Sequence, residues 1–244
     1  MARASVTAAV FLLFAATLSA ERKDVTITAD DGFPLKATWQ SAGKSGPGVL
    51  LLHQCNADRR IYDNLVAMLS AAGYNVVALD FRGFGESKNA QYKDLASSRE
   101  KMPGDVDAAL KFLSSQALVN KTLLGVLGGS CGVNQAVQAA RRHPDVRTLV
   151  FLSGATDADG EAFIKRSTKM PIFGAASEED TNAAASIKKI IGMSANKDSQ
   201  LAMFKGAGHA ASMFSKEPDL EADIVIWFRR NLPVAGYATL PSAR

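Results

Sequence analysis

The feature that most constrains the fold of this chain is a series of short apolar runs separated by helical patterns. The clearest runs lie at residues 49–52, 76–79, 122–127 and 148–152. Runs of this length with little polar alternation are typical of strands that are covered on both faces. Between them, apolar residues recur at helical spacing, as in residues 61–69. Strands that alternate with helices predict the α/β class, with a mostly parallel sheet and helices on both of its faces.

The first part of the folded chain predicts an antiparallel start to this sheet. Residues 25–28 alternate in polarity, and a turn signal at 30–32 leads into a second strand-like segment at 35–39. Later, the segment at 153–171 has room for only one helix between two strands, so we expect no large cap domain and a site open to solvent. With no internal repeat or linker in view, residues 21–244 are predicted to form one domain.

The beginning of the chain has the pattern of a secretory signal peptide. Arg3 precedes an apolar run at 8–18, and small residues follow at 19–20. The run is too short for a spanning helix, which needs about 20 apolar residues. We therefore expect residues 1–20 to be a signal peptide and the mature protein to be exported, periplasmic or secreted, without a stable membrane span. Leu18 is larger than the residue usual at its place, so a retained anchor is the alternative.

The composition argues against a nucleic-acid partner. Of the 244 residues, 47% are hydrophobic and 21% charged, and the formal net charge is +4. The basic residues are scattered, and their longest runs are pairs such as Arg59-Arg60 and Arg141-Arg142. Nucleic-acid binding requires basic residues clustered on one face. We interpret these pairs as a solvated surface and expect no nucleic acid.

A glycine-flanked serine stands where a strand meets a helix. Gly128-Gly129-Ser130-Cys131-Gly132 follows the run at 122–127 and leads directly into helical residues. This is the G-x-S-x-G pattern in its strand–turn–helix context, where free helix N–H groups can stabilise a developing negative charge. The alternative is an ordinary serine that caps a helix.

An acid and a histidine follow later strands in the same way. A strand expected at 172–175 is followed by Glu178, Glu179 and Asp180, and the last expected strand by His209. A nucleophile, an acid and a histidine, each after a strand, give the chain order Ser…Asp…His. We favour Asp180 as the acid, with its two acidic neighbours and Asp157 as alternatives.

Two further segments carry a resemblance to a known family. Leu51-Leu52-His53 is similar to a His-Gly loop entrance, and Asp80-Phe81-Arg82-Gly83-Phe84-Gly85-Glu86-Ser87 matches a D-x-R-G-x-G-x-S signature. With the serine motif, the chain resembles the α/β-hydrolase fold family, in particular its small, lidless dienelactone-hydrolase-like and carboxylesterase-like members. The resemblance covers nearly the whole mature chain, and the octapeptide is its most specific part.

This resemblance implies a role for each candidate residue. Ser130 would be the nucleophile, His209 the general base and then acid, and Asp180 the carboxylate that orients the imidazole. The backbone N–H groups of Cys131 and Cys55 would form the oxyanion hole. A serine hydroxyl needs such a base near neutral pH, and each oxyanion donor is worth about 3 kcal/mol where water is excluded.

One departure from the family is at Gln54, where glycine usually follows the histidine. Glutamine resists some conformations open to glycine, which leaves the shape of the oxyanion loop and the role of Cys55 open. Gln54 either contacts the substrate or faces solvent as a loop residue. We interpret His53 as a structural histidine that bonds to nearby backbone.

The chain's two cysteines, Cys55 and Cys131, raise two further questions. Cys131 adjoins Ser130 and could replace it as nucleophile, but the glycine frame places Ser130 in the nucleophile position. A disulfide is conceivable in an exported chain if both cysteines flank the oxyanion hole. We nevertheless expect two free, half-buried thiols.

The sequence thus predicts a serine hydrolase that works through an acyl-enzyme without metal or cofactor. The favoured activity is that of a carboxylesterase on small or medium ester-type molecules. Lactone hydrolysis of the dienelactone type, peptide hydrolysis and perhydrolysis on the same triad are alternatives. A non-catalytic binding protein with this fold is the alternative from another class. The oligomeric state is left open.

Overall fold

The computed structural model describes residues 20–236, which form one eight-stranded sheet between helices. In chain order, the strands are β1 (Arg22–Thr28), β2 (Pro34–Gln40), β3 (Gly46–Leu52), β4 (Asn75–Leu79), β5 (Val119–Gly129), β6 (Val146–Leu152), β7 (Ile172–Ser177) and β8 (Gln200–Phe204). Their order in the sheet is β1-β2-β4-β3-β5-β6-β7-β8. β2 is antiparallel to β1 and β4, and all other neighbours are parallel. The predicted antiparallel start and mostly parallel sheet are confirmed.

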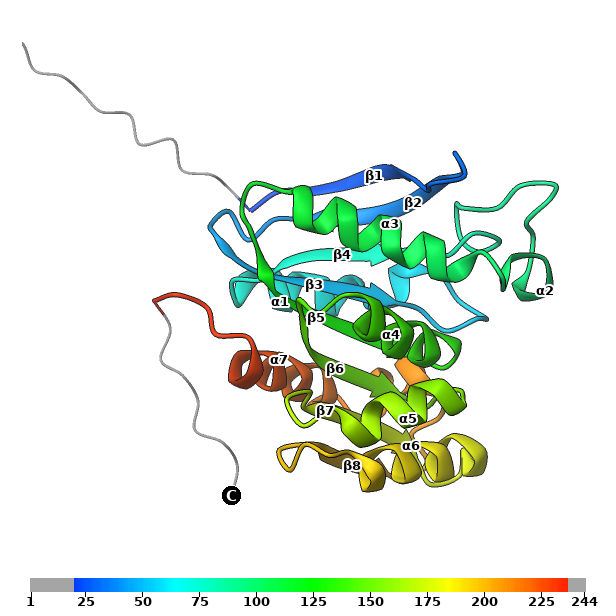
Figure 1. Ribbon diagram of the computed structural model, residues 1–244, viewed down its shortest axis with the longest axis vertical. Helices are drawn as coiled ribbons and strands as arrows, with labels where there is room; N and C mark the ends of the chain where they lie inside the picture. The colour runs from blue at the N-terminus through cyan, green and yellow to red at the C-terminus, as the bar shows by residue number, and fades with distance from the viewer. Residues whose placement is uncertain (1–19, 237–244) are drawn as a thin grey trace, which may run out of the picture.

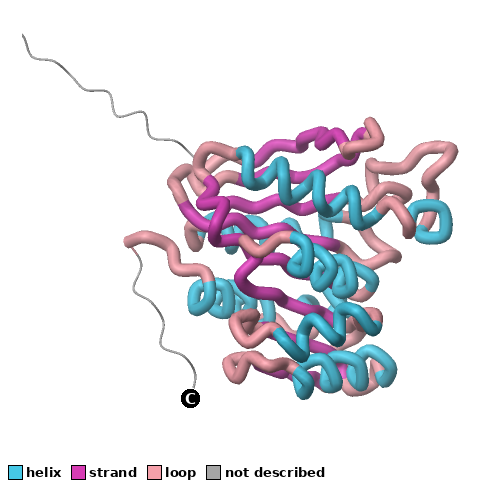
Figure 2. The backbone as a smooth tube through the Cα atoms, in the orientation of Figure 1, coloured by secondary structure: helices cyan, strands magenta, loops and turns pink. Residues whose placement is uncertain are grey.

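The helices cover both faces of the sheet (Figure 1). They are η1 (Arg59–Tyr62), α1 (Asp63–Ala71), α2 (Leu95–Ser98), α3 (Met102–Ser115), α4 (Cys131–Arg142), α5 (Ala158–Arg166), α6 (Thr181–Met193), η2 (Ala210–Ser215) and α7 (Leu220–Asn231). Helices α3 to α6 pack on one face, and α1 and α7 on the other. In Figure 2 the strands lie as a layer between these two sets.

The alternation of side chains along each strand produces two apolar cores. In β3, Leu50 and Leu52 belong to the core under α3 and α4, whereas Val49 and Leu51 belong to the core under α1 and α7. Successive side chains of a strand point to opposite faces, so a strand between two helix layers must be apolar throughout. This is the physical reason for the uninterrupted apolar runs of the sequence.

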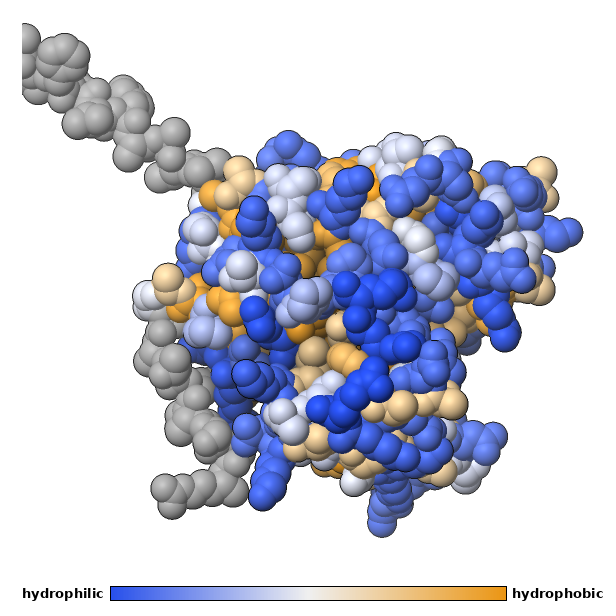
Figure 3. All heavy atoms as spheres, in the orientation of Figure 1, coloured by the Kyte–Doolittle hydropathy of each residue, from blue (hydrophilic) through white to orange (hydrophobic). Residues whose placement is uncertain are grey.

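Three further predictions from the sequence concern a cap domain, a membrane span and a signal peptide. Hydrophilic side chains cover most of the face formed by α3–α6, with small apolar patches between them (Figure 3). Between β6 and β7 the chain forms only α5, so no large cap is present in residues 20–236. In that range no helix has the length and apolar character needed to cross a bilayer. The expected signal peptide, residues 1–20, lies outside the described residues except for its last position.

Candidate active site

Ser130 lies at the carboxyl edge of the sheet, in the sharp turn between β5 and α4. Its backbone has φ +51° and ψ −114°, a region that L-residues rarely adopt. Within residues 20–236 the other non-glycine residues with positive φ are Ser153 and Ala210. Ser153 follows β6 and Ala210 begins η2 directly after His209, so all three lie beyond the carboxyl ends of strands at one edge. Backbone strain of this kind gathers at functional sites.

The glycines of the serine motif are required by the space around them. A Cβ atom on Gly128 would overlap the carbonyl oxygen of Gly132, and one on Gly132 would lie 2.6 Å from the carbonyl oxygen of Leu52. A larger residue at either position would push α4 away from the sheet. The two glycines therefore allow the tight turn that exposes Ser130.

Asp180 and His209 come together from the loops after β7 and β8. Asp180 Oδ2 lies 2.6 Å from His209 Nδ1, so the carboxylate accepts a hydrogen bond from the imidazole and fixes its orientation. Two of the other candidate acids, Glu179 and Asp157, are engaged elsewhere. Glu179 accepts from Ser177 Oγ and from the Gly206 N–H at 2.6 Å. Asp157 caps α5 by accepting from the Gly160 N–H at 2.8 Å.

The loop that carries His209 lies against the turn that carries Ser130. A Cβ atom built on Gly129 would be 3.5 Å from the Cβ of Ala210, so the neighbours of the two candidate residues lie close together. The His209 side chain is 40% exposed, as expected for an open site. The hydrogen bonds of residues 20–236 do not include one between Ser130 and His209. Catalytic hydrogen bonds are often long before a substrate binds.

Cys55 and Cys131 occupy equivalent places after two adjacent parallel strands. The register pairs Leu52 of β3 with Gly128 of β5, and each cysteine follows its paired residue by three positions. Among the hydrogen bonds of residues 20–236, none uses the backbone N–H of Cys55 or of Cys131. Two N–H groups without a partner among these bonds are candidates for the expected oxyanion donors.

The two cysteine side chains form a disulfide, with their Cα atoms 5.8 Å apart. The expectation of two free thiols is therefore wrong. The physical reason is the register just described, because equal offsets from paired strands bring the two Cα atoms within disulfide range. The alternative in which Cys131 is the nucleophile fails as well, since a sulfur bonded to Cys55 offers no thiolate.

Gln54 connects the loop after β3 to the loop that carries His209. Its side chain is 5% exposed, its Oε1 accepts from the Ala211 N–H at 3.0 Å, and its Nε2 donates to Asn56 Oδ1 at 2.8 Å. The alternative of a solvent-facing residue is therefore wrong, and the expected contact with substrate stays a prediction. Gln54 has no positive φ, so the loop needs no glycine here. The glutamine adds a link from this loop to the loop of His209.

His53 is a buried structural residue, as interpreted from the sequence. Its Nε2 accepts from the Phe81 N–H at 3.2 Å, so its Nδ1 carries the proton and donates to the carbonyl oxygen of Gln54 at 2.8 Å. Burial lowers the pKa of His53, which favours this neutral form. His53 thereby fixes the start of the loop that follows β3.

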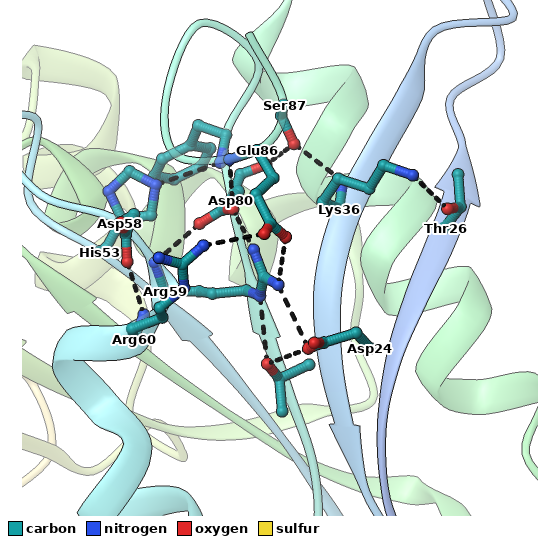
Figure 4. Close-up of polar contacts among 12 residues, drawn as sticks. Asp24, Thr26, Lys36, His53, Asp58, Arg59, Arg60, Asp80, Glu86 and Ser87 are labelled. Atoms are coloured by element: carbon teal, nitrogen blue, oxygen red, sulfur yellow. Dashed lines mark hydrogen bonds and ion pairs between the residues drawn. The ribbon is translucent and has the colours of Figure 1, made fainter.

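The signature octapeptide supports the far end of the same loop (Figure 4). Asp80 is fully buried, pairs with the Arg59 guanidinium, and accepts from the backbone N–H of Arg59 at 2.7 Å and of Glu86 at 2.9 Å. Arg59 also bonds to Glu86 at 2.6 Å and to Thr38 at 3.1 Å. Arg59 was interpreted as solvated surface, which is wrong, because its side chain is 2% exposed. Only Arg60 of this pair lies at the surface.

A second buried arginine fixes the middle of the octapeptide. Arg82 pairs with the fully buried Asp105 at 2.5 Å and with Asp31 at 2.8 Å, and it lies over the rings of Phe33 and Tyr92. The hydrogen bond from Arg82 holds the pKa of Asp31 at about 2. The octapeptide is thus a structural support beside the candidate site.

A cavity of about 730 Å³ opens beside the loop that follows β3. Cys55 forms part of its wall, together with residues 56–58, 83–86 and 93–96. Its lining includes both basic and acidic side chains, among them Arg60 and Asp94. The volume is that of a small-molecule pocket, which in proteins is about 300–1,000 Å³.

Comparison with known families agrees with this fold. Residues 44–172, just over half of the chain, match the family described as serine aminopeptidase, S33. The chain belongs to this family. As a member of this family with the sheet described above, it has the α/β-hydrolase fold, as the resemblance of its sequence implied.

Individual curated proteins match this chain at low sequence identity. The chain is 29% identical over 124 residues to Rv2307c of Mycobacterium tuberculosis, covering 50% of this chain and 42% of that protein. It is 29% identical over 125 residues to YfhR of Salmonella typhi, covering 49% and 41%. The matches span less than half the length of these curated relatives.

Among solved structures, the Pyrococcus furiosus esterase Pf2001 superposes with a TM-score of 0.71 at 22% identity, covering 88% of this chain and 94% of that one. The dienelactone hydrolase from Anabaena variabilis superposes with a TM-score of 0.70 at 16% identity, covering 87% and 99%. At these identities the likeness establishes the fold.

Proposed function

We propose that this protein is an exported serine hydrolase that cleaves carboxylic esters through an acyl-enzyme on Ser130. The observation that carries the proposal is the bond of Asp180 to His209, in a loop that lies close to the serine turn. A binding protein has no need of a carboxylate-oriented histidine beside a strained serine. The esterase and dienelactone hydrolase with the same fold make ester-type substrates the natural class to test first.

The proposed reaction follows from the position of each group. His209 Nε2 takes the proton of Ser130 as Oγ attacks the ester carbonyl, while Asp180 holds the imidazole at Nδ1 and stabilises its cation. The carbonyl oxygen becomes an oxyanion that the N–H groups of Cys55 and Cys131 receive. His209 then protonates the leaving alcohol, and water hydrolyses the acyl-enzyme in the reverse sequence.

Two features of the structure favour small or medium substrates, and two others favour a location outside the cytoplasm. The described residues form no large cap, and the cavity beside Cys55 has about 730 Å³, enough for a small molecule. The predicted signal peptide at residues 1–20 and a disulfide are both typical of exported proteins. Lactones and short peptides fit the same reaction and belong in the substrate panel.

The test is replacement of the proposed nucleophile. We expect Ser130→Ala to lose at least about 1,000-fold in kcat on a short-chain aryl ester while it folds normally, because no other group can form the acyl-enzyme. A fluorophosphonate probe should label the parent protein at Ser130. The matched control is Ser212→Ala, which removes an exposed serine three positions after His209. Undiminished turnover by Ser130→Ala would refute the proposal.

A further inference from the structure

We propose that the Cys55–Cys131 disulfide is a positioning device for the oxyanion hole, so that rapid turnover requires the oxidised protein. The inference rests on the proposed function, because it assigns the N–H groups of these two residues to the oxyanion. It goes further by making a covalent bond between their side chains responsible for the spacing of the two donors. The cysteines are thus positioning residues in addition to being amide donors.

The covalent bond joins the two halves of the proposed hole. Cys131 is the first residue of α4 and is held by the glycine-packed serine turn. Cys55 lies in an irregular loop after β3, outside any helix or strand. Each backbone N–H is attached directly to its own Cα, so fixing the two Cα atoms 5.8 Å apart limits how far the donors can separate.

Hydrogen bonds hold the loop on either side of Cys55, but those bonds lead to other parts of the fold. Before it, Gln54 is tied to Ala211, and His53 is tied to Phe81. After it, the Arg59 N–H is tied to Asp80. None of these bonds reaches the serine turn. Within residues 20–236, the Cys55–Cys131 disulfide joins this loop covalently to the first residue of α4.

The position of the disulfide also places it at the surface a substrate meets. Cys55 borders the cavity of about 730 Å³, and Cys131 borders a second cavity of about 210 Å³. Leu95 lines both cavities, and both cysteines are half-buried. The disulfide thus lies between two cavities at the surface, and its reduction would loosen the loop beside the substrate.

The alternative is that the disulfide only stabilises the fold, since it closes a separation of 76 residues. The two roles differ in what they change. A purely stabilising bond alters the folded fraction and leaves the kcat of the folded protein unchanged. A positioning bond lowers kcat in protein that is still folded, with little change in KM, because the donors act on the oxyanion more than on the bound ester.

The experiment compares oxidised protein, protein reduced by dithiothreitol, and the double variant Cys55→Ala, Cys131→Ala. In the reduction, the dithiol gives two electrons and two protons to the protein sulfurs and closes into its own cyclic disulfide. We expect reduction to lower kcat by about 10- to 100-fold, with KM within about threefold, since losing one oxyanion donor alone costs about 100- to 1,000-fold. Removal of the dithiol and reoxidation should restore the rate.

Two controls separate positioning from stability. The double variant should have low kcat and no response to dithiothreitol, which excludes an effect of the reagent elsewhere. Phe228→Leu, in the core beneath α7, should lower the melting temperature with kcat unchanged. Each assay is run well below the melting temperature of the protein tested.

The outcomes distinguish this inference from the proposed function. Fluorophosphonate labelling of Ser130 in oxidised protein, with a kcat that falls on reduction, supports both. Labelling and turnover that persist within twofold after reduction overturn the positioning role and leave the serine hydrolase intact. A rate loss that only follows the unfolded fraction overturns it as well. Oxidised protein that neither reacts with the probe nor hydrolyses esters refutes the proposed function itself.

Discussion

Replacement of Arg59 by methionine should destabilise the protein far more than the same change at its neighbour Arg60. Arg59 is 2% exposed and pairs with Asp80, which is fully buried (Figure 4). Arg60 is 55% exposed and pairs with a half-exposed Glu86 at 2.9 Å. The two residues are adjacent in sequence and identical in type, so the comparison isolates burial.

The magnitude follows from the charge that Arg59→Met leaves behind. Asp80 keeps two backbone N–H donors and loses its only direct cationic partner among residues 20–236. Two unit charges about 4 Å apart interact by about 4 kcal/mol at an effective dielectric constant of about 20. Breaking a buried pair on one side costs about 3–5 kcal/mol, whereas an exposed pair contributes about 0–1 kcal/mol. We expect these two ranges for Arg59→Met and Arg60→Met.

Urea unfolding followed by circular dichroism measures both variants as changes in the free energy of unfolding. Adding Asp80→Asn to Arg59→Met should recover part of the loss, because no unpaired charge then remains. If Arg59→Met costs no more than Arg60→Met, the buried pair does not support the loop as argued. The same result would leave the role of the octapeptide without a physical basis.

Two further changes test the acid and the buried histidine. Asp180→Asn should fold normally and lower kcat by about 10,000-fold, as loss of the orienting carboxylate does in a Ser-His-Asp triad; equal rates in steady-state assays would point to another acid. Burial holds the pKa of His53 below its ordinary value of about 6.5, so the unfolded chain takes up this proton first as the pH falls. The stability from neutral His53 is therefore complete above about pH 6.5 and is lost below it, by at most about 1.4 kcal/mol per pH unit. In unfolding measurements from pH 7 to 5, His53→Asn should show a shallower slope, and parallel slopes would contradict this account.

The fold could be predicted from the sequence because a strand that is buried on both faces consists of consecutive apolar residues. Residues 49–52 and 149–152 are apolar without interruption, and both lie in central strands. The short α2 (Leu95–Ser98) was not predicted, since one helical turn has too few residues for a periodic pattern. The boundaries of strands such as β5 (Val119–Gly129) extend beyond the apolar run, because backbone pairing continues past the buried residues.

The candidate site was predictable where a residue's place follows from the end of a strand. Ser130, Asp180 and His209 each come just after a strand, and parallel strands end at one edge. The buried Arg59 gave no such signal, because its neighbour Arg60 made the pair look like solvated surface. The reach of Gln54 to Ala211 was equally hidden, since it joins loops that are 157 residues apart in sequence.

The disulfide was predictable only in part from the sequence. From sequence alone, Cys55 and Cys131 could be placed in loops at one edge, and this made a bond conceivable without deciding it. The decision depends on register, which pairs Leu52 with Gly128 and gives the cysteines equal offsets along neighbouring strands. A shift of one residue in that register would displace one Cα by more than 3 Å along the strand direction, and the range of Cα separations that a disulfide allows is only about 2 Å wide. The same register sets the two backbone donors beside Ser130, so the pairing of β3 with β5 determines both the disulfide and the spacing of the proposed oxyanion hole.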